Sequence, residues 1–221
     1  MARLDMHLIF DLDGTLVDSH AGIHYAVQQA VKQIYPAYDL SSLNIKIGPP
    51  VRAMFEKAFS PVAETELDQL EAAFRHSYDG GAWKMTNVYQ GVKETISTFC
   101  NEGIPCYIVT NKPLLASKRI LTYVEIAQFF VDIISPDSCQ PTFRNKAEMI
   151  RYLFNQHNFA PENAFYIGDF VDDFQAAESC GLEFIGIESG YGTFPETKSF
   201  RKAKSFAGLL SLLQLEETRS H

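Results

Sequence analysis

The chain lacks long apolar stretches and is short of positive charge. Among its 221 residues, no apolar run reaches the roughly 18–20 residues that a membrane-spanning helix requires. The first five residues, MARLD, are too short and too polar for a secretory signal. A formal net charge of −8 disfavours a broad basic surface for nucleic acid or for an anionic membrane. We therefore expect a cytoplasmic protein that binds neither nucleic acid nor membranes.

Cysteine is also scarce, and no two cysteines form a CxxC pair. A chain of this length can hold one large domain, or one domain with a smaller insertion, without disulfide support. We therefore expect buried free thiols rather than two disulfides. The four cysteines, all in or beside apolar segments, are Cys100, Cys106, Cys139 and Cys180.

Short apolar runs alternate with helical patterns along most of the chain. Each run is unbroken rather than alternating, which is typical of a strand covered on both faces. The pattern predicts an α/β fold, a doubly wound parallel sheet with its ligand site beyond the carboxyl ends of the strands. The expected strands are 6–10, 104–109, 131–134, 164–167 and 183–187. The expected helices are 92–100, 114–124, 146–157 and 172–179.

One segment, from residue 19 to residue 84, interrupts this alternation. It shows helical patterning without a convincing strand, and about 65 residues are too many for a loop between a strand and a helix. The expected helices are 23–34, with Asp18 or Ser19 as its cap, 51–59 and 64–78. We expect a small all-helical cap domain at 19–84 and an α/β core made of 1–18 and 85–221.

Two aspartates, Asp11 and Asp13, directly follow the first expected strand. Buried carboxylates are costly unless they are neutralised, and a hard cation such as Mg²⁺ takes oxygen ligands. A solvated Asp-Gly turn explains the pair alone equally well. Other polar residues that follow expected strands or open a helix are Thr110, Lys146, Asp169 and Asp173. Because the carboxyl ends of parallel strands meet at one edge, these residues are expected to share a site.

These motifs resemble those of the haloacid dehalogenase superfamily of hydrolases, in its phosphoglycolate-phosphatase-like branch with a helical cap. The resemblance rests on residues 11–19 (DLDGTLVDS), on 109–113 (VTNKP), and on Gly168-Asp169 followed by Asp173. It covers the expected core and is weak in the cap. It implies a Mg²⁺-dependent phosphatase that hydrolyses a small phosphorylated metabolite, such as phosphoglycolate, a sugar phosphate or a nucleotide, through an aspartyl-phosphate intermediate.

The resemblance also implies catalytic roles. Asp11 would be the nucleophile, and Asp13 the general acid and then the general base. Thr110 would donate a hydrogen bond to the transferring phosphoryl group, and Lys146 would offset the charge of Asp11. In this branch the lysine often precedes a proline, whereas here it precedes Ala147, which leaves Arg144 and Lys118 as weaker candidates.

The implied metal site holds Mg²⁺ between aspartates. Asp11, the backbone carbonyl of Asp13 and Asp169 would be ligands, and Asp173 would be a further ligand or a supporting anchor. Phe170 stands where a small residue such as serine is common, and we expect it to leave metal binding unchanged.

Substrate recognition is expected from four further residues. Arg52 lies in a segment that resembles the cap loop of this branch, and it could bind a second anionic group. An exposed helical arginine is an equally good interpretation. His20 follows the first motif, and Asn111 and Lys112 follow Thr110. The sequence leaves open the substrate itself and the choice between monomer and homodimer.

Other activities on the same fold remain as alternatives. A dehalogenase normally lacks the second aspartate of the first motif, so Asp13 together with Asp169 argues against it. A phosphonatase would need a cap lysine such as Lys46 or Lys57 to form a Schiff base. A phosphomutase, or a non-catalytic binding or regulatory protein, would also be compatible with the fold.

Overall fold

The computed structural model describes residues 6–190, 192, 194 and 199–214. The chain divides into two compact units. Unit 1 comprises the described residues of Met1–Asp18 and Val88–His221, and unit 2 is Ser19–Asn87. The boundaries expected from the sequence lie after residues 18 and 84.

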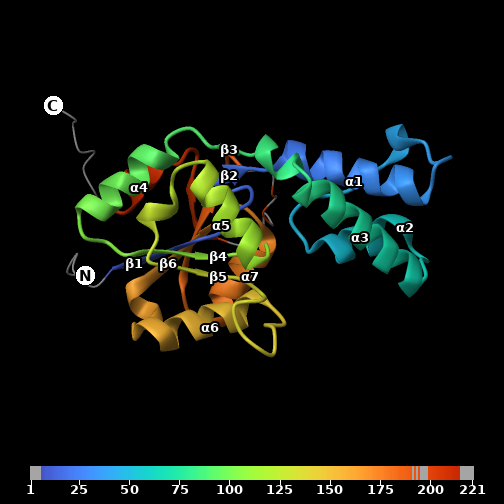
Figure 1. Ribbon diagram of the computed structural model, residues 1–221. Helices are drawn as coiled ribbons and strands as arrows, with labels where there is room; N and C mark the ends of the chain where they lie inside the picture. Colours follow the sequence, from blue (N-terminus) through green and yellow to red (C-terminus); the bar gives the residue numbers. More distant parts are fainter. Residues whose placement is uncertain (1–5, 191, 193, 195–198, 215–221) are drawn as a thin grey trace. The chain divides into compact units, whose positions relative to one another are not determined.

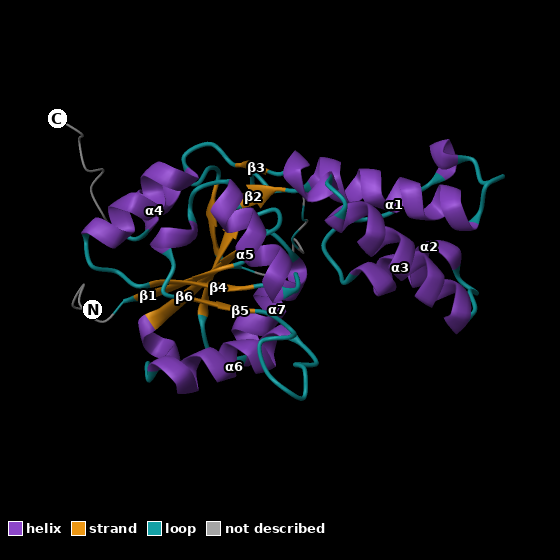
Figure 2. Ribbon diagram, viewed as in Figure 1, coloured by secondary structure: helices purple, strands orange, loops and turns teal. Residues whose placement is uncertain are grey.

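Unit 1 is built on a six-stranded sheet in the order β5-β4-β1-β6-β7-β8, and each pair of neighbours is parallel (Figures 1 and 2). The strands are β1 (His7–Phe10), β4 (Cys106–Val109), β5 (Asp132–Ile134), β6 (Ala164–Gly168), β7 (Glu183–Ile187) and β8 (Arg201–Ala203). The predicted α/β fold is therefore confirmed. β8 was not expected from the sequence, because an edge strand tolerates charged residues where the inner strands need apolar ones.

Helices cover both faces of the sheet (Figure 1). Ile9 packs in a buried cluster with residues of α6 and α7, whereas Phe10 stacks on Phe99 of α4. Successive strand residues point to opposite faces, so α4 lies across the sheet from α6 and α7. The helices of unit 1 are α4 (Val92–Asn101), α5 (Leu114–Tyr123), α6 (Lys146–His157), α7 (Val171–Ser179) and the short α8 (Gly208–Leu212). Two 3₁₀ turns, η4 (Ala127–Phe129) and η5 (Pro161–Asn163), join elements of this unit.

Unit 2 is helical, as the sequence predicts. Its helices are α1 (His20–Ile34), α2 (Val51–Phe59) and α3 (Glu64–Asp79), with 3₁₀ turns η2 (Leu40–Ser42) and η3 (Ala82–Met85). Ser19 occupies the N-cap of α1, but its side chain makes no capping hydrogen bond. The reason is its backbone, since a ψ of 3° departs from the extended conformation that directs a capping side chain at the first turn.

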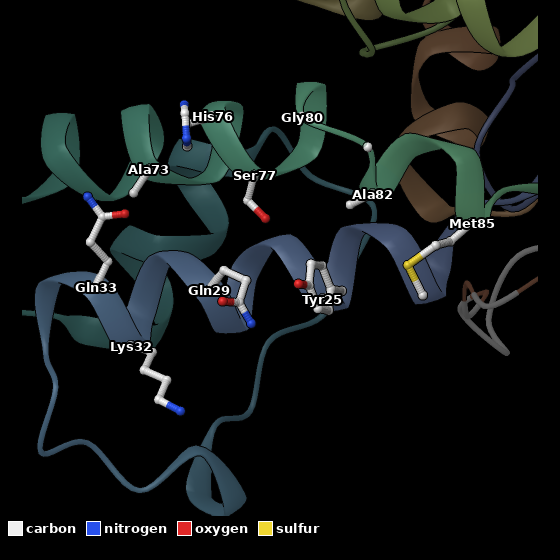
Figure 3. A pocket seen from close by; sticks show the side chains of 11 residues that line it. Tyr25, Gln29, Lys32, Gln33, Ala73, His76, Ser77, Gly80, Ala82 and Met85 are labelled. Carbon is white, nitrogen blue, oxygen red and sulfur yellow. The ribbon is translucent and has the colours of Figure 1, made fainter.

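A groove of about 630 Å³ lies within unit 2, between α1 and α3 (Figure 3). Small buried residues, among them Ala73 and Ala82, contribute to its lining. Figure 3 shows the ammonium group of Lys32 and the ring of His76 turned away from the facing helix. The groove is thus polar without an inward-facing charge, and its lining belongs to unit 2, whereas the aspartates of the predicted site belong to unit 1.

The chain leaves unit 1 and returns to it through a two-stranded ribbon of β2 (Val17–Asp18) and β3 (Asn87–Val88). Within the described ranges, no helix combines the length and the apolar character that crossing a membrane requires. All four cysteines are free, as predicted, but only Cys106 is buried. Cys100 is exposed because it follows the buried Phe99 on α4, and successive helical residues point about 100° apart.

Candidate active site

The register of the sheet brings the predicted site residues to one edge. Phe10, the last residue of β1, is paired with Ile108 on one side and with Ile167 on the other. The residues that follow these strands therefore emerge together. They include Asp11 after β1 and Asp169 after β6. This convergence depends on strand order, which brings together residues more than 150 positions apart in the sequence.

Three buried carboxylates form the centre of the site. Asp11, Asp169 and Asp173 each offer an oxygen, and these oxygens lie within 4.8 Å of one another. Asp173 lies in the first turn of α7, where its Oδ2 accepts a hydrogen bond from the Phe170 N–H at 3.0 Å. The negative charge also suits the positive end of the helix dipole. Local backbone structure thus places the third carboxylate beside the other two.

Glycines make the close approach of these carboxylates possible. A Cβ at Gly168 would lie 2.5 Å from an oxygen of Asp173, and one at Gly14 would lie 2.3 Å from an oxygen of Asp169. Gly14 also has a φ of +86°, a conformation that side chains other than glycine rarely adopt. Each glycine is therefore required by the space that a carboxylate occupies.

Two hydrogen bonds hold Asp169. The hydroxyl of Thr15 donates to its Oδ1 at 3.2 Å, and the N–H of Gly192 donates to its Oδ2 at 3.0 Å. Burial nevertheless raises the pKa of Asp169 to about 7, with a further contribution from the charge of Asp173. The carboxylate is oriented but not neutralised by its neighbours.

One lysine offsets part of this charge. Lys146, the first residue of α6, places its Nζ 3.1 Å from Asp11 and 2.5 Å from Asp173. Burial alone would lower the pKa of Lys146, but the charges of Asp11 and Asp173 outweigh it and hold that pKa well above its ordinary value. The weaker candidates for this position, Arg144 and Lys118, are exposed.

The carboxylates outnumber the ammonium group. When all are ionised, three negative charges face one positive charge in a buried space. Burial raises the pKa of Asp11 to about 8, although Lys146 opposes the shift, and nearby carboxylates, Asp173 first among them, add to it. The excess of two negative charges would be neutralised either by protons or by one divalent cation.

The donor set fits a hard divalent cation such as Mg²⁺. All the ligand atoms are carboxylate oxygens, which this ion prefers. Asp11 Oδ1 is buried and, apart from its ion pair with Lys146, accepts no hydrogen bond. Both oxygens of Asp173 accept hydrogen bonds, Oδ1 from Lys146 and Oδ2 from the Phe170 N–H, and the Tyr166 hydroxyl lies 3.4 Å from Oδ1. Hydrogen bonds engage both oxygens of Asp169 as well, so what distinguishes Asp173 is the Lys146 ammonium at 2.5 Å, closer than the 3.1 Å to Asp11. A cation already engages Asp173 most closely, which makes Asp11 and Asp169 the better candidates for ligands.

Asp13 and Lys112 form a second ion pair. Lys112 Nζ lies 2.9 Å from Oδ2 and 3.2 Å from Oδ1 of Asp13. The Asp13 side chain is not part of the three-carboxylate cluster. Thr110 is buried directly after β4, and the half-buried Asn111 follows it in the same loop. The structure thus gathers these residues in unit 1 with the cluster.

A family model described as haloacid dehalogenase-like hydrolase matches residues 8–187, which is most of the chain. The chain belongs to the haloacid dehalogenase-like hydrolases. The resemblance of the motifs is therefore confirmed.

Relatives within this family are similar over most of their lengths. A phosphoglycolate phosphatase of Photobacterium profundum is 31% identical over 192 residues, 83% of each chain. A 5'-nucleotidase of Pseudomonas aeruginosa is 27% identical over 96% of each chain. A haloacid dehalogenase-like hydrolase from Streptococcus pneumoniae has a similar structure, with a TM-score of 0.84 at 25% identity, over 97% of this chain and all of that one. These likenesses confirm the predicted class of enzyme, a phosphoric monoester hydrolase of this family.

The two cap residues of the predicted site belong to unit 2. Arg52 pairs with carboxylates of α3, with Asp68 at 2.7 Å and also with Glu64 and Glu71. Hydrogen bonds, first with Asp68 and then with Glu64, raise the pKa of Arg52. His20 begins α1 and stacks on His24. Their expected role in substrate recognition stays a prediction.

Two residues of this hydrolase site were missed from the sequence. Thr15 belongs to the first motif and bonds Asp169. Tyr166 lies inside β6, and its hydroxyl donates to the Val109 carbonyl at 2.8 Å and contacts Asp173 at 3.4 Å. A hydroxyl in the middle of an otherwise apolar strand was the available signal for Tyr166, since a buried hydroxyl needs a partner.

Proposed function

We propose that the protein is a Mg²⁺-dependent phosphatase that hydrolyses a small phosphorylated metabolite through an aspartyl-phosphate on Asp11. The observation that carries this proposal is the buried group of Asp11, Asp169 and Asp173 beside a single Lys146. Phosphoryl transfer depends on positioning and on stabilisation of charge, and an excess of buried carboxylate supports both once a divalent cation is bound.

The residues would divide the reaction as follows. A carboxylate oxygen of Asp11 attacks phosphorus while Asp13 protonates the departing oxygen of the ester. Asp13 then takes a proton from the water that attacks the aspartyl-phosphate, which releases inorganic phosphate and restores Asp11. Thr110 donates a hydrogen bond to the transferring group, and Lys146 limits repulsion between Asp11 and the phosphate. Mg²⁺, when bound, supplies neutralising charge for the carboxylates and the phosphoryl oxygens.

We propose a metal site formed by Asp11, Asp169 and the backbone carbonyl of Asp13, with Asp173 as the anchor of Lys146. This assignment is supported by the close ion pair of Lys146 with Asp173, at 2.5 Å, against 3.1 Å to Asp11. Phe170 is compatible with it, because the hydrogen bond that Phe170 donates to Asp173 comes from its backbone N–H, which any residue other than proline supplies.

The substrate class is a phosphate monoester of a small metabolite. Relatives named phosphoglycolate phosphatase and 5'-nucleotidase support phosphoglycolate and nucleoside monophosphates as the first candidates, with sugar phosphates beside them. The two candidate lysines of the cap, Lys46 and Lys57, are exposed, which favours simple hydrolysis over Schiff-base chemistry. We expect a cytoplasmic monomer or homodimer.

Phosphate release from a panel of phosphorylated metabolites tests this proposal. Activity should require Mg²⁺, disappear in EDTA, and fall by at least about 10³-fold in Asp11→Asn. The matched control is Asp172→Asn, which removes an exposed aspartate from the same region and should keep most of the activity. Metal binding without Asp11-dependent hydrolysis of any panel member would instead indicate a non-catalytic protein.

The panel should be repeated with Arg52→Ala. A loss confined to substrates that carry a second anion would support Arg52 as a selector. An equal effect on every substrate would indicate that its contacts with α3 matter only for the structure of unit 2.

A further inference from the structure

The site contains a second buried lysine, and this lysine contacts a different carboxylate from the first. Lys146 faces Asp11 and Asp173, whereas Lys112 reaches both oxygens of Asp13, at 2.9 and 3.2 Å. The side chain of Lys112 is only 7% exposed and that of Asp13 is 18% exposed. Ion pairs with so little access to water are screened far less than surface pairs.

The loop that carries Lys112 is fixed on both sides. The N–H of Lys112 donates to the Thr110 hydroxyl at 3.2 Å, and the Ser117 hydroxyl donates to the Pro113 carbonyl at 3.1 Å and lies 3.4 Å from the Lys112 carbonyl. The N–H of Thr110 in turn donates to the Ile134 carbonyl in the neighbouring strand at 3.1 Å. Pro113 follows as the N-cap of α5. The backbone of Lys112 is therefore held at a fixed distance from the end of β1.

Asp13 lies in a tight turn after β1. The N–H of Gly14 donates to the Val17 carbonyl at 2.9 Å, and Asp13 itself forms a bridge with Val17. Its backbone is thus fixed, while rotation of its short side chain could still turn the carboxylate. The two-point contact with Lys112 restricts that rotation.

We infer that Lys112 is a positioning residue for Asp13, rather than the substrate ligand that its place in the sequence suggested. In the acid step Lys112 would hold Asp13 through one carboxylate oxygen, while the other oxygen carries the proton that Asp13 gives to the leaving oxygen. The inference rests on the proposed function, in which Asp13 is the acid of the first step. It goes beyond that function because it names Lys112, in the motif at residues 109–113, as the residue that orients Asp13.

A positioning role for Lys112 has a consequence that a role as substrate ligand would not have. Protonation of the leaving oxygen is needed for an alkyl phosphate, whose alkoxide is a poor leaving group, and hardly at all for 4-nitrophenyl phosphate. The kcat/KM value reports the steps up to release of the alcohol or phenol, so it isolates the step in which Asp13 is an acid. Loss of Lys112 should therefore lower kcat/KM much more for substrates with a poor leaving group than for 4-nitrophenyl phosphate.

The test uses the full chain with Mg²⁺ and three probes: glycerol 3-phosphate, phosphoglycolate and 4-nitrophenyl phosphate. In Lys112→Met, kcat/KM should fall about 10²-fold or more for both alkyl phosphates and less than about 5-fold for the aryl phosphate. Equal losses for all three probes would overturn the inference, as would a loss confined to phosphoglycolate, which carries a second anion. Lys118→Met, an exposed lysine of α5, is the matched control and should leave all three values unchanged.

Asp13→Asn provides the second arm. It should show the same dependence on leaving group, and Lys112→Met in an Asp13→Asn background should cause little further loss, because both changes remove one function. Additive losses would contradict the inference. Lys112→Gln replaces Lys112→Met if the apolar side chain prevents folding. If the wild-type protein shows no hydrolysis that depends on Asp11, the proposed function and this inference are refuted together. If the wild type is active and Lys112→Met keeps the wild-type kcat/KM for all three probes, the inference alone is refuted.

Discussion

At the scale of single residues, the site holds more negative than positive charge. Two lysines are shared among four aspartates, and each lysine has separate partners. A buried charge that loses its partner is costly, because neither water nor another group replaces the contact. The ion pairs therefore matter for stability as well as for chemistry.

Removing Lys146 should destabilise the protein. Lys146→Met keeps the length of the side chain but leaves Asp11 and Asp173 without their cation. We expect the free energy of unfolding in EDTA to fall by about 3 kcal/mol, measured by urea denaturation. Lys118→Met should change it by less than about 0.5 kcal/mol. A loss of similar size in both variants would show that the buried ion pairs contribute nothing specific.

A methyl group at Gly190 should disturb the metal site. Its Cβ would lie 2.3 Å from the Cβ of Asp169 and 2.4 Å from the Gly14 carbonyl oxygen, so Asp169 must move. We expect Gly190→Ala to weaken Mg²⁺ binding by about 10-fold or more, measured by calorimetry. Gly208→Ala is the control, since its Cβ would make only ordinary contacts at 3.8 Å. Unchanged affinity in Gly190→Ala would argue against Asp169 as a ligand.

At the scale of elements, the site depends on three adjacent parallel strands. β4 and β6 flank β1, and the shared register brings the residues that follow these strands together. Tyr166 strengthens this arrangement, because its hydroxyl joins the end of β4 to the first turn of α7. One buried hydroxyl thus contacts both the last residue of β4, Val109, and the carboxylate of Asp173.

Tyr166→Phe should reduce stability without changing the fold. The substitution leaves the Val109 carbonyl without this donor, and we expect the free energy of unfolding to fall by about 1–2 kcal/mol. Urea denaturation in the presence of Mg²⁺ measures the loss, and the circular dichroism spectrum should stay the same. A stability equal to that of the wild type would mean that the hydroxyl adds nothing to the sheet edge.

At the scale of the whole molecule, the two units differ in what they contain. Unit 1 holds the carboxylates and both lysines, while unit 2 is a helical insertion with its own core and groove. The elevated pKa values of Asp11 and Asp169 connect the site with the stability of the whole protein, because protonation then differs between folded and unfolded chains.

The metal-free protein should therefore lose stability as the pH rises. The pKa values of Asp11 and Asp169 in the folded protein are about 8 and about 7, so the folded chain holds protons that the unfolded chain has released. The contribution of these two carboxyl groups to stability is then fully present below about pH 4 and is lost as the pH rises towards 8. Each such proton gives a slope of about 1.4 kcal/mol per pH unit. Urea denaturation in EDTA between pH 5 and 8 measures it.

Two comparisons identify the source of this slope. Asp11→Asn should reduce it in EDTA, because one of the retained protons is gone. Saturating Mg²⁺ should flatten it in the wild type, because the cation takes the place of the protons. A stability that rises with pH in EDTA would contradict the raised pKa values of Asp11 and Asp169.

The parts of the fold that could be predicted are those that depend on neighbouring residues in the sequence. The bounds of α2 and α6 agree with the sequence pattern, because apolar periodicity and flanking prolines or caps are local properties. β8 could not be predicted, since an edge strand of sequence RKA has no apolar pattern. The missing cap hydrogen bond of Ser19 likewise depends on a backbone angle that residue type does not determine.

The sequence by itself determined the family, the class of fold and the identity of Asp11, Asp13, Thr110, Lys146 and Asp169 as candidates, because these features lie in short motifs beside apolar strands. Only the tertiary structure decided how they pair. It placed Lys146 between Asp11 and Asp173, gave Lys112 to Asp13, and brought the hydroxyls of Thr15 and Tyr166 into the site. The physical reason is that contacts between distant residues depend on strand order and register, which residue types and their spacing leave unspecified.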